Sequence, residues 1–321
     1  MATERPPTID AKAAQRWLTL PTSASPWLHE EVARRMEERL GWINLKPAAW
    51  AHWAPVRGSL QAHGLISQRY PTSLSYVVEV PVNHQQLAIN SIVKPWWNPT
   101  RWMGAATRFE APPDAGVQMV WANMALHMAA DPQALISAWH QALAVDGFVM
   151  FSCLGPDTLR EMRQIYAEQG WPAPSHEFTD MHDWGDMLVA AGFAEPVMDM
   201  ERITLSFSSP ERLLQELRTL GRNLHPARFA GLRGRGWLAQ LCQQISERLK
   251  AQAPQKAQNG DDDSNHSGNV PQLKLTFEVI YGHALKPLPR VKMQAESSMS
   301  VMDMRLALQR GKVSKGFGSS P

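Results

Sequence analysis

The sequence predicts an α/β fold in which a mostly parallel sheet is covered by helices on both faces. Short runs rich in β-branched and aromatic residues alternate with amphipathic segments of helical length, an order typical of parallel sheets. With 321 residues and 44% hydrophobic content, the chain can bury a full core. Helix start and stop signals between these segments support the same division of the chain.

The first expected element is a helix within the N-terminal segment, residues 1–45. Apolar residues recur every fourth position from Leu28 to Leu40, with charges between them, which indicates a helix that covers a core. An apolar run over 48–56 then predicts the first strand. A helix over 60–70 and a buried strand over 73–82 follow, so the order is strand, helix, strand.

The middle of the chain continues this alternation. A strand begins within 116–126, and the next helix has Asp131 as its N-cap, Pro132 at its first position and Gly147 beyond its end. A short buried strand is expected over 148–155. Asp157 is expected to cap the helix after it.

Two further strands, over 195–207 and 273–287, enclose a helical stretch and an arginine-rich turn, which predicts a helical insertion before the last strand. Residues 250–271 are polar and rich in turn formers, as disordered loops are. The expected organisation is N-terminal cover helices (1–45), a core (46–207), a helical lid (208–249), the loop (250–271), the last strand (272–290) and a C-terminal segment with a mobile tail (291–321).

Charge and cysteine content exclude several classes of function. A net charge of +2 gives no general attraction to nucleic acid or to membranes. Cys153 and Cys242 form no metal or redox spacing, and two thiols in a chain of this length suit a reducing, cytoplasmic location. The segment 176–183 holds two His and two Asp at a spacing that matches no metal site, so helix capping is the expected role. No apolar run has the length of a signal peptide or a membrane span.

Four segments between 148 and 223, FSCLGPDTLREMR, FTDMHDWGDMLVAAGF, EPVMDMERITLSF and LLQELRTLGRN, resemble class I methyltransferases of the BioC type. The resemblance implies a Rossmann-like fold and S-adenosyl-L-methionine as cofactor. It also implies methylation of the malonyl carboxylate on acyl carrier protein, in biotin synthesis. A carboxylate is already a nucleophile at neutral pH, so this reaction depends mainly on positioning.

The glycine-rich turn of that family is altered here. The family has a strand ending in Asp and then Gly-x-Gly-x-Gly, and the matching positions hold His52, Ala54, Val56 and Gly58. Pro55 stiffens the turn, and Val56 disfavours positive φ. We expect the side chains at 54–56 to fill space that the donor would occupy.

The other expected cofactor contacts lie at the ends of later strands. By resemblance Glu79, Asn123 and Gly58 are cofactor-binding, with the Glu79 carboxylate accepting hydrogen bonds from the ribose hydroxyls. A solvent-facing Glu79 at the strand end is the alternative. His127 follows Asn123 in a segment similar to the family's SNLALHW, which lines the substrate end of the pocket; a packed core histidine is its alternative.

Arg218 and Arg222 belong to a group of five arginines within 18 positions of the expected lid. They are candidates for binding an anionic substrate or the acidic face of a carrier protein. A solvated basic helix face is the alternative. Two hypotheses for the whole chain follow: an active methyltransferase, and a non-catalytic relative that keeps the fold and acts through a protein partner.

Overall fold

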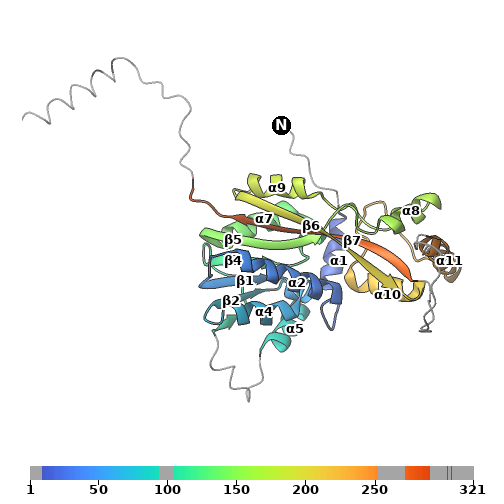
Figure 1. Cartoon of the computed structure of the whole chain (residues 1–321), viewed down its shortest axis with the longest axis horizontal. Helices are drawn as coiled ribbons and strands as arrows, with labels where there is room; N and C mark the ends of the chain where they lie inside the picture. Colours follow the sequence, from blue (N-terminus) through green and yellow to red (C-terminus); the bar gives the residue numbers. More distant parts are fainter. Residues whose placement is uncertain (1–8, 94–104, 252–271, 290–301, 303–304, 306–321) are drawn as a thin grey trace, which may run out of the picture. The chain divides into compact units, whose positions relative to one another are not determined.

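The computed structural model describes residues 9–93, 105–251 and 272–289, together with 302 and 305. A seven-stranded sheet, in the order β3-β2-β1-β4-β5-β7-β6, forms the centre of the unit that ends at Pro287 (Figure 1). The strands from β3 to β5 are parallel, and β7 runs antiparallel to both of its neighbours. The predicted mostly parallel sheet is confirmed. The strands are β1 (Ala49–Trp53), β2 (Leu74–Val78), β3 (Thr107–Arg108), β4 (Val117–Ala122), β5 (Leu143–Leu154), β6 (Ala194–Phe207) and β7 (Leu273–Leu285).

Helices cover both faces of this sheet, as predicted. Trp50 and Trp121 lie on one face of the sheet. Both are fully buried in a cluster with apolar side chains from several helices. Trp139 and Trp184 belong to the helices that cover the other face. The first face carries α2 (Trp27–Arg39), α4 (Leu60–Arg69), α8 (Arg160–Glu168), α10 (Pro210–Leu220) and α11 (Arg235–Ala251), and the second carries α7 (Pro132–Ala142) and α9 (Met181–Ala190).

Several local predictions are confirmed. Leu28, Val32 and Met36 of α2 are all buried, as their spacing predicted. The carboxylate of Asp131 caps α7 by accepting a hydrogen bond from the Ala134 N–H, and Asp180 caps α9 from within the 176–183 segment. The insertion before the last strand consists of α10 and α11, which follow β6 and precede β7.

None of the helices in the described ranges has the length and apolar character that crossing a bilayer demands.

Three local predictions are wrong. The strand expected over 73–82 stops at Val78, and the chain enters an unpredicted helix, α5 (Val82–Ile92), after Pro81. The strand expected over 148–155 begins already at Leu143, directly after α7 ends at Ala142, so Gly147 lies within β5 and does not end the helix. Asp157 does not cap α8: the N-cap is Leu159, in the left-handed conformation, and the Asp157 carboxylate binds the Arg202 guanidinium instead.

Two predictions fall largely on residues that the structure does not describe. Of the expected loop 250–271, the first two residues end α11 and the rest lies outside the described residues. The expected mobile tail within 291–321 also lies outside them, apart from two single positions.

Candidate functional site

The candidate site lies where the parallel strands β1, β2 and β4 end side by side, because open α/β sheets bind ligands at this edge. The turn after β1 leads into α3 (Pro55–Gly58), a single helical turn. Ala54, the N-cap of α3, has φ 50° and ψ 50°, a left-handed conformation that costs a residue with a Cβ about 1–2 kcal/mol. Val56, in contrast, is helical. The backbone thus has the shape that glycine favours at the position of the first lost glycine.

Glu79 directly follows β2 and points back at this turn. Its carboxylate accepts a hydrogen bond of 2.7 Å from the Val56 N–H, and its other oxygen lies 3.9 Å from Nδ1 of His84. The side chain is only 4% exposed, so the solvent-facing alternative is wrong. Burial raises the pKa of Glu79 to about 7, although the Val56 N–H and the Arg57 charge both oppose this shift.

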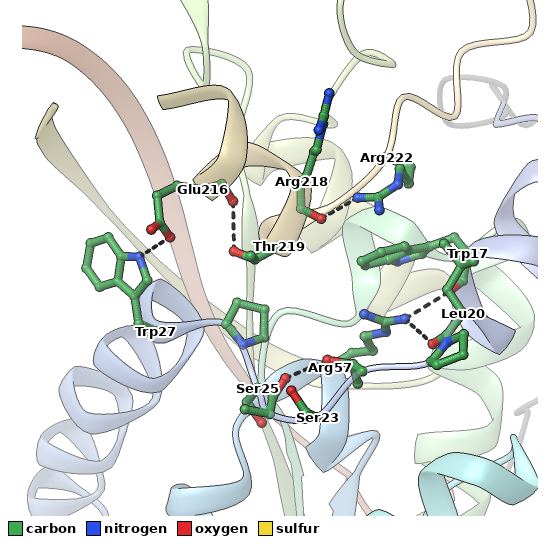
Figure 2. A pocket seen from close by; sticks show the side chains of 14 residues that line it. Trp17, Leu20, Ser23, Ser25, Trp27, Arg57, Glu216, Arg218, Thr219 and Arg222 are labelled. Atoms are coloured by element: carbon green, nitrogen blue, oxygen red, sulfur yellow. Dashed lines mark hydrogen bonds between the residues drawn. The ribbon is translucent and has the colours of Figure 1, made fainter. Parts of the chain in front are cut away.

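Residues 17–25, which we call the N-terminal strap, lie across the turn and the start of α5. The strap begins at the end of α1 (Ala11–Thr19). Arg57 donates hydrogen bonds to the backbone oxygens of Trp17 (3.2 Å) and Leu20 (2.7 Å) (Figure 2). The Leu20 oxygen also lies 3.2 Å from Nε2 of His84. These contacts hold the strap over the edge at which Glu79 lies.

The residues at this edge do not fit an adenosyl donor in the conformation described. Val56 is completely buried, and its amide donates to one of the two oxygens of the carboxylate expected to bind ribose. The strap covers the same edge from outside. Glu79 has the right chemistry and position for a ribose contact, but the protein's own groups surround it.

His52, at the position of the family's aspartate, supplies no negative charge. It is fully buried, its ring stacks on that of His63 at a centroid distance of 5.7 Å, and neither ring nitrogen has a hydrogen-bond partner among the described residues. Burial holds the pKa of His52 well below its usual value, and the neighbouring His63 lowers it further. The imidazole is therefore neutral at physiological pH.

Asn123 and Gly58 hold the turn against the end of β4. The Asn123 side-chain amide donates to the backbone oxygens of His29 (2.8 Å) and Gly58 (2.9 Å), and its Oδ1 accepts from the Ser152 hydroxyl (2.7 Å). A Cβ at Gly58 would lie 2.6 Å from the Asn123 backbone oxygen. The observed contacts of both residues are thus within the protein, and their assignment to the cofactor stays a prediction.

We expect Gly58→Ala to lower the free energy of unfolding by about 1–3 kcal/mol, because the turn must move away from the Asn123 carbonyl to make room. Urea denaturation followed by fluorescence measures the change. Gly64→Ala is the matched control: it lies within α4 with no atom within 4 Å of the added Cβ, so it should stabilise the helix slightly. Equal effects of the two substitutions would contradict this account of the turn.

His127 lies in the interior, in the short 3-10 helix η2 (Leu126–Met128). Its ring packs edge-on against Phe178, and its backbone oxygen lies 2.9 Å from Nε2 of His176. Burial lowers the pKa of His127 well below the usual value, with the nearby histidines adding to the effect. These surroundings are those of the packed alternative, and the substrate role stays a prediction.

Arg218 and Arg222 line a pocket of about 720 Å³ together with the strap and Arg57. In Figure 2 the Arg222 side chain approaches the ring of Trp17, whereas the Arg218 side chain points away from Arg57. Arg57 and Trp17 were not predicted from the sequence, since no local pattern connects positions 17, 57 and 222.

The chain is similar to curated proteins that share one name. No family model matches the chain. The chain is 36% identical to a malonyl-[acyl-carrier protein] O-methyltransferase of Gallionella capsiferriformans, over 84% of this chain and 87% of that relative. It is 33% identical to a protein of the same name from Laribacter hongkongensis, over 86% of this chain and 88% of the relative. Among solved structures, the YcgJ protein of Bacillus subtilis matches with a TM-score of 0.48 at 12% identity, over 81% of this chain and 99% of that one.

Proposed function

Because this chain belongs to the malonyl-[acyl-carrier protein] O-methyltransferase family, we propose that it transfers a methyl group from S-adenosyl-L-methionine to the malonyl carboxylate on acyl carrier protein, as a step of biotin synthesis. The observation that carries the proposal is the extent of the similarity, 36% identity over 87% of the length of a relative with that name. The two cysteines, both unpaired, support a reducing location such as the cytoplasm.

In this proposal the family residues keep their assigned roles. Glu79, Gly58 and Asn123 contact the cofactor, Glu79 through the ribose hydroxyls, and Arg218 and Arg222 meet the anionic acceptor. His127 lines the substrate end of the pocket. The acceptor carboxylate needs no general base, because it is ionised at neutral pH. The strap must move off the turn before a donor can reach Glu79, since the strap covers the edge at which the donor would bind.

The test is methyl transfer to a carrier protein that bears a malonyl group. The purified full chain is incubated with S-adenosyl-L-methionine and malonyl-acyl carrier protein, and mass spectrometry should find the acceptor heavier by one methylene. Acetyl-acyl carrier protein, which lacks a free carboxylate, is the control and should stay unchanged. Absence of product, together with no calorimetric binding of S-adenosylhomocysteine at millimolar concentration, would favour the non-catalytic hypothesis instead.

A further inference from the structure

The N-terminal strap, residues 17–25, helps to close the edge at which Glu79 lies. One oxygen of the Glu79 carboxylate accepts a hydrogen bond from the Val56 N–H, and the other faces the ring of His84. The second nitrogen of that ring bonds to the Leu20 oxygen of the strap. The Glu79 side chain is only 4% exposed beneath these groups. A ribose can therefore reach the carboxylate only after part of this cover has moved.

Each hydrogen bond between the strap and the described core involves a side chain. Trp17 is the one buried residue of the strap, and most side chains over 20–25 are exposed. A segment with few buried apolar contacts and exposed hydrogen bonds opens at a low free energy. The strap is therefore the part of the cover that moves most easily. Its bonds run from Arg57 (Figure 2) and His84 to the Leu20 oxygen, from Arg57 to the Trp17 oxygen, from Asn83 to the Thr19 oxygen (3.4 Å), from the Ser25 hydroxyl to the Pro55 oxygen and from the Leu60 N–H to the Ser25 hydroxyl.

His84, in the first turn of α5, connects the strap with Glu79. Its Nε2 atom lies 3.2 Å from the Leu20 oxygen, and its Nδ1 atom lies 3.9 Å from the Glu79 carboxylate. A carbonyl oxygen can only accept, so Nε2 carries the hydrogen and donates it to the strap. The ring is 1% exposed. One buried imidazole thus lies between the strap and the carboxylate that would bind ribose.

We propose that the strap is an intramolecular inhibitor of donor binding, and that the hydrogen bond from His84 to the Leu20 oxygen is the latch that holds it closed. The role of the strap rests on the proposed function, in which Glu79 binds the ribose of the donor. Because strap and donor compete for one edge, the apparent affinity is the intrinsic affinity multiplied by the fraction of molecules with the strap open. Weakening the latch raises this fraction, so such a variant binds the donor more tightly than the wild type does.

Limited proteolysis of the full chain with thermolysin, without ligand, tests the latch. His84→Ala removes one hydrogen bond of the strap, so cleavage within 17–25 should become roughly 3- to 10-fold faster, since cleavage follows the open population. His84→Gln keeps an N–H donor and should be cleaved nearly as slowly as the wild type. Gln86→Ala is the matched control, because the Gln86 side chain is exposed on α5 and bonds to Asn90. Equal cleavage of His84→Ala and Gln86→Ala would show that there is no latch.

A second variant loosens the strap without creating a cavity. Asn83 is exposed on α5 and donates to the Thr19 oxygen of the strap, so Asn83→Ala should speed cleavage in the same direction and by a smaller factor. Mass spectrometry of the fragments separates strap opening from unfolding: opening exposes only sites near 17–25, whereas unfolding exposes sites along the whole chain. Cleavage spread over the whole chain in both variants would overturn the proposal.

Calorimetry with S-adenosylhomocysteine tests the inhibition. His84→Ala should bind roughly 3- to 10-fold more tightly than the wild type, and Asn83→Ala should change affinity in the same direction. Residues that only supported the site would weaken binding when removed. Where the ligand binds, tighter binding by neither variant rejects the strap as an inhibitor.

The effect of the ligand on the wild-type strap has a sign of its own. S-adenosylhomocysteine should speed cleavage within 17–25, because it binds only the open state. Slower cleavage would mean that the strap closes over the ligand, which overturns the proposal. No binding by the wild type or by either variant rejects the proposed function and the inhibition with it, and the cleavage rates alone then decide on the latch. Methyl transfer with equal affinities in all three proteins keeps the proposed function and rejects the inhibition.

Discussion

Glu79→Ala is expected to reduce the affinity for S-adenosylhomocysteine on the order of 100-fold and to remove measurable methyl transfer. In the proposed complex the carboxylate accepts hydrogen bonds from two ribose hydroxyls, and charge-assisted bonds contribute about 1.5–3 kcal/mol each. Calorimetry measures the affinity. Glu38→Ala, which removes an exposed carboxylate of α2, is the control and should bind as the wild type does. An unchanged affinity of Glu79→Ala, in a protein that binds the ligand, would remove Glu79 from the site.

The same residue predicts a dependence of binding on pH. Because the pKa of Glu79 is raised to about 7, the carboxyl group is mostly protonated at pH 6 and mostly ionised at pH 8. Ligand affinity should therefore rise roughly tenfold between these values, since only the ionised form accepts both bonds. Glu79→Gln should bind weakly with no such rise. A wild-type affinity that is flat from pH 6 to 8 would mean that Glu79 titrates elsewhere or does not touch the ligand.

The free energy of unfolding of the ligand-free protein should fall as the pH rises, whereas ligand affinity rises. A carboxyl group whose pKa is higher in the folded than in the unfolded protein favours folding when protonated. That contribution is fully present below about pH 4.5 and is lost as the pH rises through about 7. Glu79→Gln should remove this loss and so be more stable than the wild type at pH 8, by up to roughly 3 kcal/mol. Denaturant titration at several pH values checks the sign.

Asn123→Ala is expected to lower the free energy of unfolding by roughly 3–5 kcal/mol. The substitution removes the three buried hydrogen bonds of the Asn123 side chain, with the backbone oxygens of His29 and Gly58 and with the Ser152 hydroxyl. Each buried hydrogen bond lost while its partner stays in place costs about 1–3 kcal/mol, and relaxation around the smaller side chain recovers part of the sum. For a chain of this length the melting temperature should fall by about 10 °C.

Asn90→Ala is the control for this prediction, because the Asn90 side chain is exposed and, among the described residues, bonds only to Gln86 one helical turn away. It should change stability by less than about 0.5 kcal/mol. If Asn123→Ala instead leaves stability intact and weakens only ligand binding, its role is that of a cofactor contact, as the resemblance implies.

Elements with a strong local signal were predicted correctly from the sequence. The stripe of α2 and the cap of α7 depend on residues three or four positions apart, and such patterns survive in any fold that buries one helix face. The helix α5 was missed because the apolar run of β2 continues through Val80 and Val82, which are both exposed. Proline at 81 was the one sign that the strand had ended.

The site was less predictable because its contacts join distant segments. Glu79 could be placed from the end of a strand, but its bond to the Val56 amide follows from the path of the turn. Asn123 bonds to α2 and to α3, which lie 94 and 65 positions away. The pairing of Arg57 and Arg222 on Trp17 has no local signature at all, since each residue alone resembles an ordinary surface arginine or core tryptophan.

The left-handed backbone at Ala54 makes this position the simplest place to begin a redesign of the turn. Reverting that alanine to glycine removes a methyl group and leaves the surrounding main chain where it already is. Ala54→Gly is therefore a first step toward the family's glycine pattern that leaves the main chain of the turn in place. Laboratory evolution toward tighter nucleoside recognition has its natural first step there.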